Sequence, residues 1–387
     1  DKQQHIILAS GMADEEGRRP LVLEKGVLYL QRYWDYECLL AKKVVSLTSV
    51  EHVVEPLAGI IDQYFSNTDH IDWQKEAAKA TLKYSFSIVT GGPGTGKTTT
   101  VVKILALLQE LSEQPLNIAL AAPTGKAAMR LQESIAKSKA GLPCSESIRH
   151  QIPEQVITIH RLLGAQPPSP YFKYNEDCSL PYDIVVVDEV SMIDLALMSK
   201  LVSAMKVNAR LILLGDKDQL ASVETGTVLA DLTKALPKHT QALKKSYRFS
   251  GNIKVFSEFV NQQAAREAWE LLEEGRVDMC LLKDDLIDYI VNKQTQYLKL
   301  INEKAEFSAC YSAFNEFQVL CATRQGLYSV DDINDRVTET LKEHKLIQSS
   351  GEWYSGRPVM ITQNDTVLQL YNGDIGLCMS DTEAGGQ

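Results

Sequence analysis

The stretch GGPGTGKT, residues 91–98, fits the phosphate-loop pattern G-x-x-x-x-G-K-[ST]. In such a loop, backbone N–H groups and the N-terminus of the following helix point at phosphate oxygens. Lys97 would supply a charge to the β- and γ-phosphates, and the Thr98 hydroxyl would bind Mg²⁺. The motif therefore predicts a nucleoside triphosphate site with Mg²⁺ as its metal. The residues predicted to hold the phosphates are Gly91, Gly92, Pro93, Gly94, Thr95, Gly96, Lys97, Thr98 and Thr99.

An acidic pair, Asp188 and Glu189, ends the apolar run IVVV roughly 90 residues after this loop. A carboxylate at that position is suited to hold Mg²⁺, usually through water, which assigns the metal to Asp188 together with Thr98. Glu189 is the natural base for activating an attacking water. A purely structural capping pair is the alternative interpretation.

Three more residues could complete a nucleotide site. Gln219 follows the apolar run in LLGDKDQL, and its amide can donate to a phosphate and accept from water. Arg248 in SYRF could reach the γ-phosphate and neutralise developing charge there. Gln74, 17 residues before the loop, could hydrogen-bond an adenine edge, although an exposed helix residue is the simpler interpretation.

The stretch APTGKAAM, residues 122–129, repeats the Thr-Gly-Lys of the phosphate loop. A phosphate loop needs a glycine five residues before its Gly-Lys pair, and Leu120 stands there. It also needs a hydroxyl after the lysine, where this stretch has Ala127. The stretch is therefore predicted not to be a second nucleotide site.

A polar strand end with a helix N-terminus still suits another phosphate, such as one in a nucleic-acid backbone. Thr124 and Lys126 are candidates for that contact, and Thr158 and His160 in TIHRLLG are a second pair. Between residues 120 and 163 there are six Lys or Arg against three acids, in a chain of net charge -10. Chance fluctuation of charge, and an ordinary exposed lysine at a helix start, stay open as alternatives.

The elements that would position these residues alternate between strand-length apolar runs and helical segments. Near-continuous apolar strands are typical of a parallel sheet covered by helices on both faces, with sites at the carboxyl ends of its strands. Predicted strands lie within residues 86–90, 116–124, 182–190 and 209–216, and helices over 98–111 and 125–138.

Farther along, residues 250–316 are predicted to be mainly helical. FQVLCATRQG, residues 317–326, is predicted to be a strand leading into a loop, at the start of a second α/β domain. We expect three parts: an N-terminal region, 1–70, suited to contact a partner subunit; a first α/β domain, 71–245, with the nucleotide site; and a second domain, 246–387.

The composition, 44% hydrophobic and 23% charged, is ordinary for a globular protein. Seven cysteines are scattered without any Cys-x-x-Cys spacing, which favours reduced thiols and a cytoplasmic location. No apolar run approaches the roughly 20 residues that cross a bilayer, so no membrane partner is expected.

Taken in order, the motifs GGPGTGKTTT, AAPTGKAAMRLQES, TIHRLLG, VVVDEVSMID, LLGDKDQLASVETG and KKSYRF resemble those of superfamily 1 DNA helicases. The resemblance is closest to the RecD family, the alpha subunits of exodeoxyribonuclease V, and covers most of residues 20–380. It implies an α/β fold with a RecA-like phosphate-loop motor domain, a small N-terminal region and a second, incomplete RecA-like domain.

The resemblance also implies an ATP- and Mg²⁺-dependent 5′-to-3′ motor on single-stranded DNA, working with RecB and RecC subunits in recombinational double-strand-break repair. Lys97, Glu189, Gln219 and Arg248 match the family's catalytic residues, and Gln74 its adenine contact; Thr124, Lys126, Thr158 and His160 fall in motifs that line the DNA path. In the family, a VHKSQG-like motif and a TRA-like motif follow the segment that matches NGDIG, and neither follows it here. We therefore expect the chain alone to unwind DNA poorly.

Two other functions remain open from the sequence. One is a phosphate-loop ATPase that acts on protein, such as a loader, which the Gly-Asp-x-x-Gln motif and SYRF disfavour. The other is a non-catalytic subunit that binds nucleotide as a switch, which the intact Lys97, Asp188 and Glu189 disfavour.

Overall fold

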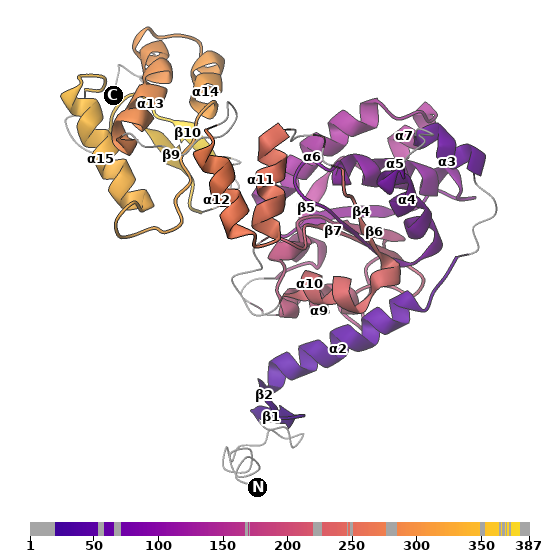
Figure 1. Cartoon of the computed structure of the whole chain (residues 1–387). Helices are drawn as coiled ribbons and strands as arrows, with labels where there is room; N and C mark the ends of the chain where they lie inside the picture. Colours follow the sequence, from indigo (N-terminus) through magenta and orange to yellow (C-terminus); the bar gives the residue numbers. More distant parts are fainter. Residues whose placement is uncertain are drawn as a thin grey trace. The chain divides into compact units, whose positions relative to one another are not determined.

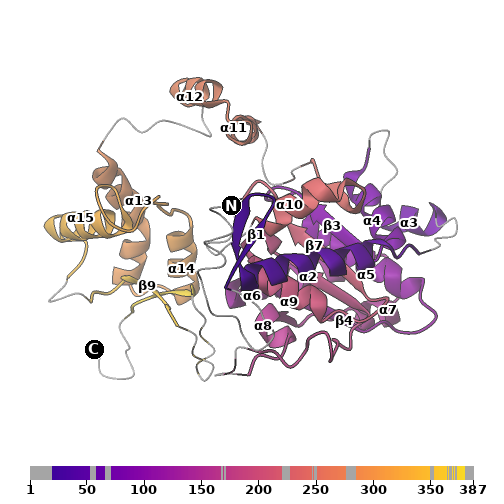
Figure 2. The ribbon, with the colours of Figure 1, turned by 90° about the horizontal axis from the view of Figure 1, so that it is seen from below.

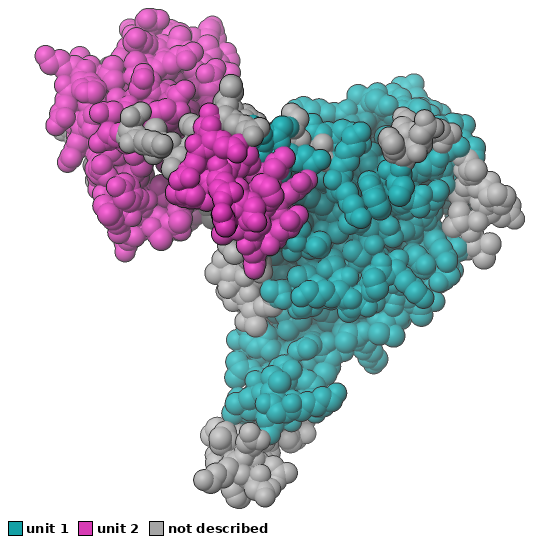
Figure 3. Space-filling view, viewed as in Figure 1, with its two compact units in different colours: residues 1–254 teal, residues 255–387 magenta. Residues whose placement is uncertain are grey.

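A computed structural model describes residues 20–52, 58–65, 71–166, 169, 171–219, 227–245, 247, 251–275, 285–348, 353–363, 365, 368, 370 and 373–379. The chain forms two compact units, residues 1–254 and 255–387 (Figure 1; Figure 3). The division into three functional domains stays a prediction.

The first unit is built on a six-stranded sheet in which every pair of neighbouring strands is parallel (Figure 1). Its strand order is β5-β4-β6-β7-β3-β8. The predicted α/β fold and the four predicted strands are thus confirmed, with two short strands added at the edges. The strands are β3 (Phe86–Thr90), β4 (Ile118–Ala122), β5 (Val156–Thr158), β6 (Ile184–Val187), β7 (Arg210–Gly215) and β8 (Thr240–Ala242).

Helices cover both faces of the sheet, because its central strands are apolar on both sides (Figure 1). Figure 2 views the unit from the side on which α2 lies. In β4, Leu120 and Ala122 enter one core while Ala119 and Ala121 enter the other. The first core also takes residues from α3 (Ala58–Tyr64), α4 (Trp73–Lys83), α5 (Lys97–Glu110), α6 (Gly125–Ala140) and α7 (Glu146–Gln151). The second takes residues from α2 (Gln31–Thr48), α8 (Ile159–Leu162), α9 (Leu195–Ser203) and α10 (Val228–Ala235).

The N-terminal hairpin of β1 (Leu21–Glu24) and β2 (Val27–Leu30) leads directly into α2. Leu40, Val44 and Leu47 of α2 are buried in the second core, and α2 packs against α9. These residues therefore belong to the same compact unit as the sheet. A contact between residues 1–70 and a partner subunit stays a prediction.

The second unit has a helical core with one short antiparallel pair, β9 (Pro358–Met360) and β10 (Ile375–Leu377). Ile290, Leu298, Cys310 and Leu341 are among its buried residues. The described parts of residues 250–316 are mainly helical, as predicted. The described helices from residue 251 onward are α11 (Gly251–Asn261), α12 (Ala265–Glu273), α13 (Leu286–Asn302), α14 (Phe307–Asn315) and, beyond residue 316, α15 (Val330–Glu343).

The strand predicted for residues 317–326 is wrong in this structure. None of these residues lies in a strand, and the Leu320 side chain is 93% exposed. A strand needs a hydrogen-bonding neighbour, and the paired strands in the described part of this unit, β9 and β10, pair with each other. An apolar sequence pattern carries no information on whether such a neighbour is beside it.

No helix in the described part of the chain combines the length and the apolar character that crossing a membrane requires.

Candidate nucleotide-binding site

The phosphate loop connects the buried strand β3 to α5, as its motif predicts. Gly96 precedes the helix with φ +81°, and Gly94 has φ +74°. Residues with a side chain rarely adopt this left-handed conformation, so glycine suits both positions. The backbone N–H of Tyr247 donates to the Gly94 carbonyl at 2.8 Å, which ties Tyr247 to the loop.

Glycine is required at position 91 for a different reason, because there is no room for a side chain. A Cβ placed there would lie 2.7 Å from Thr95 Oγ1 and 3.0 Å from the Leu243 carbonyl oxygen. Its N–H donates to the carbonyl of Gly215 at 3.2 Å, so the loop begins against the end of β7. A larger residue at this position would push the loop away from the sheet.

The Lys97 ammonium lies in the mouth of the loop. Its Nζ donates to the carbonyls of Gly91 at 2.6 Å and Gly92 at 3.3 Å. The Thr95 hydroxyl donates to the same Gly92 carbonyl at 2.9 Å. Phosphate oxygens are charged acceptors, which attract an ammonium more strongly than neutral carbonyls do. The lysine is therefore placed to exchange these carbonyls for a bound phosphate.

The acidic pair follows β6 directly. The Asp188 N–H donates to the Ala121 carbonyl at 3.0 Å, which fixes the pair beside the end of β4. The pKa of Asp188 is raised to about 6, mainly by burial and also by the Glu189 carboxylate, whereas the Glu189 N–H and the Lys97 charge oppose the increase. A cation near Asp188 would stabilise its ionised carboxylate and so lower this pKa.

Glu189 has a left-handed backbone, with φ 53° and ψ 41°. Such a conformation is unfavourable for a residue with a side chain, and it is found at functional sites more often than elsewhere. Its backbone N–H donates to Asp188 Oδ1 at 2.8 Å. The turn at Glu189 therefore holds the Asp188 carboxylate in place and also sets the direction of the Glu189 side chain. Both side chains line the same cavity as the phosphate loop.

That cavity, of about 550 Å³, brings together the loop residues Gly94 to Thr99, the acidic pair and Gln219. Gln219 follows β7, which lies between β3 and β6, so it enters between the loop and the acidic pair. Thr124 and Lys126, predicted only as nucleic-acid contacts, line this cavity too. The lining residues that the sequence did not single out are Ala127, Arg130, Leu131, Ser134 and Met192.

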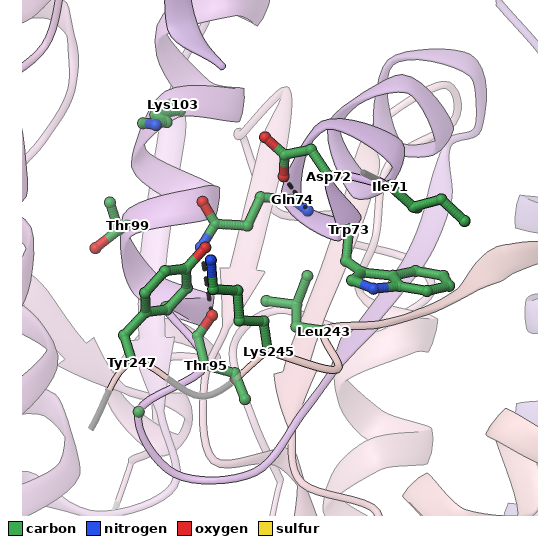
Figure 4. Close-up of a pocket in the computed structure, with 12 residues that line it drawn as sticks. Ile71, Asp72, Trp73, Gln74, Thr95, Thr99, Lys103, Leu243, Lys245 and Tyr247 are labelled. Carbon is green, nitrogen blue, oxygen red and sulfur yellow. Dashed lines mark hydrogen bonds between the residues drawn. The ribbon is translucent and has the colours of Figure 1, made fainter. Parts of the chain in front are cut away.

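A second cavity, of about 910 Å³, shares Gly94, Thr95, Gly96 and Thr99 with the first. Figure 4 shows the residues that line it. Gln74 lines it, and its Nε2 donates to the Thr95 carbonyl at 3.3 Å. Asp72 caps α4 by accepting from the N–H of Gln74, which positions the glutamine at the helix start.

The residues of this second cavity that sequence reasoning missed include Trp73, Lys103, Lys245 and Tyr247. Tyr247 and Trp73 stand in the stretches SYRF and DWQKEAAKA that drew attention to Arg248 and Gln74, so a signal for them existed. Lys245 also stands in the motif KKSYRF, whereas Lys103 carried no such signal. Burial lowers the pKa of Lys103, against the opposing charge of Asp72.

The candidates for nucleic-acid contact lie at the ends of neighbouring strands, since Ala122 of β4 pairs with Thr158 of β5. Thr124 caps α6 by accepting from the Ala127 N–H at 3.2 Å, and Thr158 caps α8 by accepting from the Arg161 N–H at 3.3 Å. The exposed His160 packs edge-on against Phe172, with ring centroids 5.8 Å apart. Arg248 lies outside the described residues.

The residues predicted to bind Mg²⁺ suit that ion. Thr98 and Asp188 line one cavity and offer the hard oxygen donors that Mg²⁺ prefers. Within the described ranges, no group of three or more His, Cys, Asp or Glu residues could hold a metal. Mg²⁺ would therefore share these two side chains with phosphate oxygens and water, as is usual for this ion.

Comparison with known proteins agrees with this geometry. A family described as AAA domain matches residues 74–225, which include the loop, the acidic pair and Gln219. The RecBCD enzyme subunit RecD of Haemophilus influenzae is 35% identical over 94% of this chain and 67% of its own length.

The chain belongs to the RecD family.

The RecBCD enzyme subunit RecD of Mycolicibacterium smegmatis is 38% identical over 92% of this chain and 65% of its own length. The chain thus spans about two thirds of the length of these RecD relatives. Among solved structures, one of Pif1 helicases at forked double-stranded DNA matches with a TM-score of 0.39 and 19% identity, over 81% of this chain and 72% of that one.

Proposed function

We propose that this RecD-family chain is an ATP-dependent DNA motor that hydrolyses ATP to move along single-stranded DNA. The observation that carries the proposal is the single cavity that holds the phosphate loop, the acidic pair and Gln219 at the carboxyl edge of a parallel sheet. The RecD family membership supports DNA as the track.

The proposed hydrolysis uses the chain's own groups as follows. Lys97 leaves the Gly91 and Gly92 carbonyls for the β- and γ-phosphates. Thr98 and Asp188 would hold Mg²⁺, which would neutralise phosphate charge when bound. Glu189 removes a proton from the attacking water. Gln219 orients that water and the γ-phosphate from between the loop and the acidic pair.

Two further contacts belong to this proposal. Gln74 would hydrogen-bond adenine from the second cavity, next to its present contact with the Thr95 carbonyl. Arg248 would reach the γ-phosphate, and the hydrogen bond from the adjacent Tyr247 to Gly94 supports a position of that segment beside the loop.

For DNA, we propose that Thr124, Lys126, Thr158 and His160 contact the backbone. The support is their position at the ends of the adjacent strands β4 and β5, with a cap threonine at each helix start. Lys126 also lines the phosphate-loop cavity, so the same segment would meet nucleotide and DNA. Such an arrangement would couple nucleotide binding to DNA binding through one short segment, with no chain of intervening residues between the two ligands.

The relatives' name, RecBCD enzyme subunit RecD, supports a wider role that we also propose. The chain would work in the cytoplasm with RecB and RecC in double-strand-break repair and move 5′ to 3′. The N-terminal region, residues 1–70, would contact a partner subunit, residues 71–245 would be the first motor domain and residues 246–387 part of the second.

The deciding experiment measures ATP hydrolysis with and without single-stranded DNA. We expect DNA to stimulate hydrolysis, and Glu189→Gln to abolish turnover while ATP binding persists. Glu133→Gln is the matched control, because Glu133 is an exposed acid on α6 that does not line the cavity. Turnover that survives in Glu189→Gln would refute the base assignment, and hydrolysis indifferent to DNA would refute the motor.

A further inference from the structure

Arg130 enters the phosphate-loop cavity from α6, and the proposed function does not yet use it. Lys126, Arg130 and Ser134 follow one another at intervals of four residues, and all three line the cavity. Residues four apart lie on one face of a helix, so this face of α6 is turned toward the loop. The contact continues one turn later, where the hydroxyls of Ser138 and Thr99 are 3.3 Å apart.

The opposite side of α6 fixes this orientation. Ala128 and Ile135, which do not line the cavity, are both at least 95% buried in the core between the helices and the sheet. Rotating α6 to turn Arg130 away from the cavity would expose them, at a cost of about 1.5–3 kcal/mol for the Ile135 side chain alone. The position of Arg130 at the cavity is therefore set by packing.

The Arg130 guanidinium is exposed and makes no hydrogen bond or ion pair with the described residues. It shares the cavity with two other cations, Lys97 and Lys126, and with the carboxylates Asp188 and Glu189. A guanidinium presents five donors in a fork that matches phosphate oxygens. An unpartnered guanidinium in a phosphate-binding cavity is suited to an anionic ligand.

The side from which Arg130 enters indicates which phosphate it would meet. The end of β4, which leads into α6, is hydrogen-bonded to Asp188, so α6 begins on the acidic-pair side of the cavity. The nucleotide's terminal phosphate must lie on that side, since Glu189 activates the water that attacks it. We propose that Arg130 binds the terminal phosphate of ATP; this rests on the proposed ATPase function and adds a residue to it.

The proposal predicts discrimination between ATP and ADP. Binding of a non-hydrolysable ATP analogue and of ADP should be measured with Mg²⁺ and without DNA. Arg130→Ala should lower affinity for the ATP analogue about tenfold or more and leave ADP affinity near that of the unchanged chain. Arg130→Lys, which keeps the charge but loses the fork, should lie between the two.

Lys137→Ala is the matched control, because it removes an exposed cation from the same helix without touching the cavity. The inference is overturned if Arg130→Ala keeps the normal ratio of ATP to ADP affinity, weakens both equally, or weakens only single-stranded DNA binding. These outcomes leave the proposed function intact as long as the unchanged chain shows DNA-stimulated hydrolysis. An unchanged chain that fails to bind ATP overturns both.

Discussion

The pH dependence of folding tests the electrostatics of the acidic pair directly. Burial, and then the Glu189 carboxylate, raise the pKa of Asp188 from 3.8 to about 6 in the folded, nucleotide-free chain. The folded state therefore holds a proton on Asp188 over a pH range in which the unfolded chain has lost it. Stability is consequently higher below pH 4 than above pH 6 as far as this group is concerned.

The magnitude follows from the difference of about two pH units, which corresponds to about 3 kcal/mol of unfolding free energy. Asp188→Asn removes the ionisation and keeps the shape. As pH rises from about 4 to about 7, the unfolding free energy of the variant should increase by about 3 kcal/mol relative to that of the unchanged chain. Above about pH 7 the difference between the two should stay constant.

Urea unfolding at several pH values, with nucleotide and divalent ions removed, measures this difference. Asp177→Asn is the control, because Asp177 is an exposed loop carboxylate in the same unit. Glu189→Gln removes the neighbouring negative charge, so it should lower the pKa of Asp188 and reduce the pH-dependent gain. An equal stability difference at pH 4.5 and pH 7 would refute the reasoning.

Three other substitutions test the site. Gly96→Ala forces a side chain into a φ of +81° and places its Cβ 2.5 Å from Gln74 Nε2, so ATP affinity should fall at least tenfold in a binding titration; normal affinity would contradict the role of the loop. Gln74→Ala should reduce the preference for ATP over GTP, and an unchanged preference in competition binding would remove Gln74 from base recognition. Lys126→Ala should weaken DNA stimulation of hydrolysis while ATP binding without DNA changes less than about threefold; loss of ATP binding alone would reassign Lys126 to the nucleotide.

Much of the nucleotide site could be predicted because its parts are local in sequence. The phosphate loop is eight consecutive residues, and its glycines, lysine and threonine act through backbone geometry that the motif itself encodes. The apolar runs that precede the loop and Asp188 identified the strands, because short apolar runs that alternate with helical segments are typical of buried parallel strands. Parallel strands then place their carboxyl ends along one edge of the sheet.

The strand prediction for residues 317–326 failed for the opposite reason. Strand formation depends on a partner that is distant in sequence, and Leu320 remains 93% exposed without one. A run of apolar residues shows only that burial would be favourable.

The sequence by itself determined the order of the motifs, the family they belong to and the chemistry that each contiguous stretch can perform. Only the tertiary structure decided that APTGKAAM, although it lacks the Gly and hydroxyl of a phosphate loop, borders the same cavity as that loop. It also gave Glu189 its left-handed backbone and turned Arg130 toward the phosphate-loop cavity. The physical reason is that these properties follow from strand order and from which face of α6 is buried, and both are set by contacts between residues far apart in the chain.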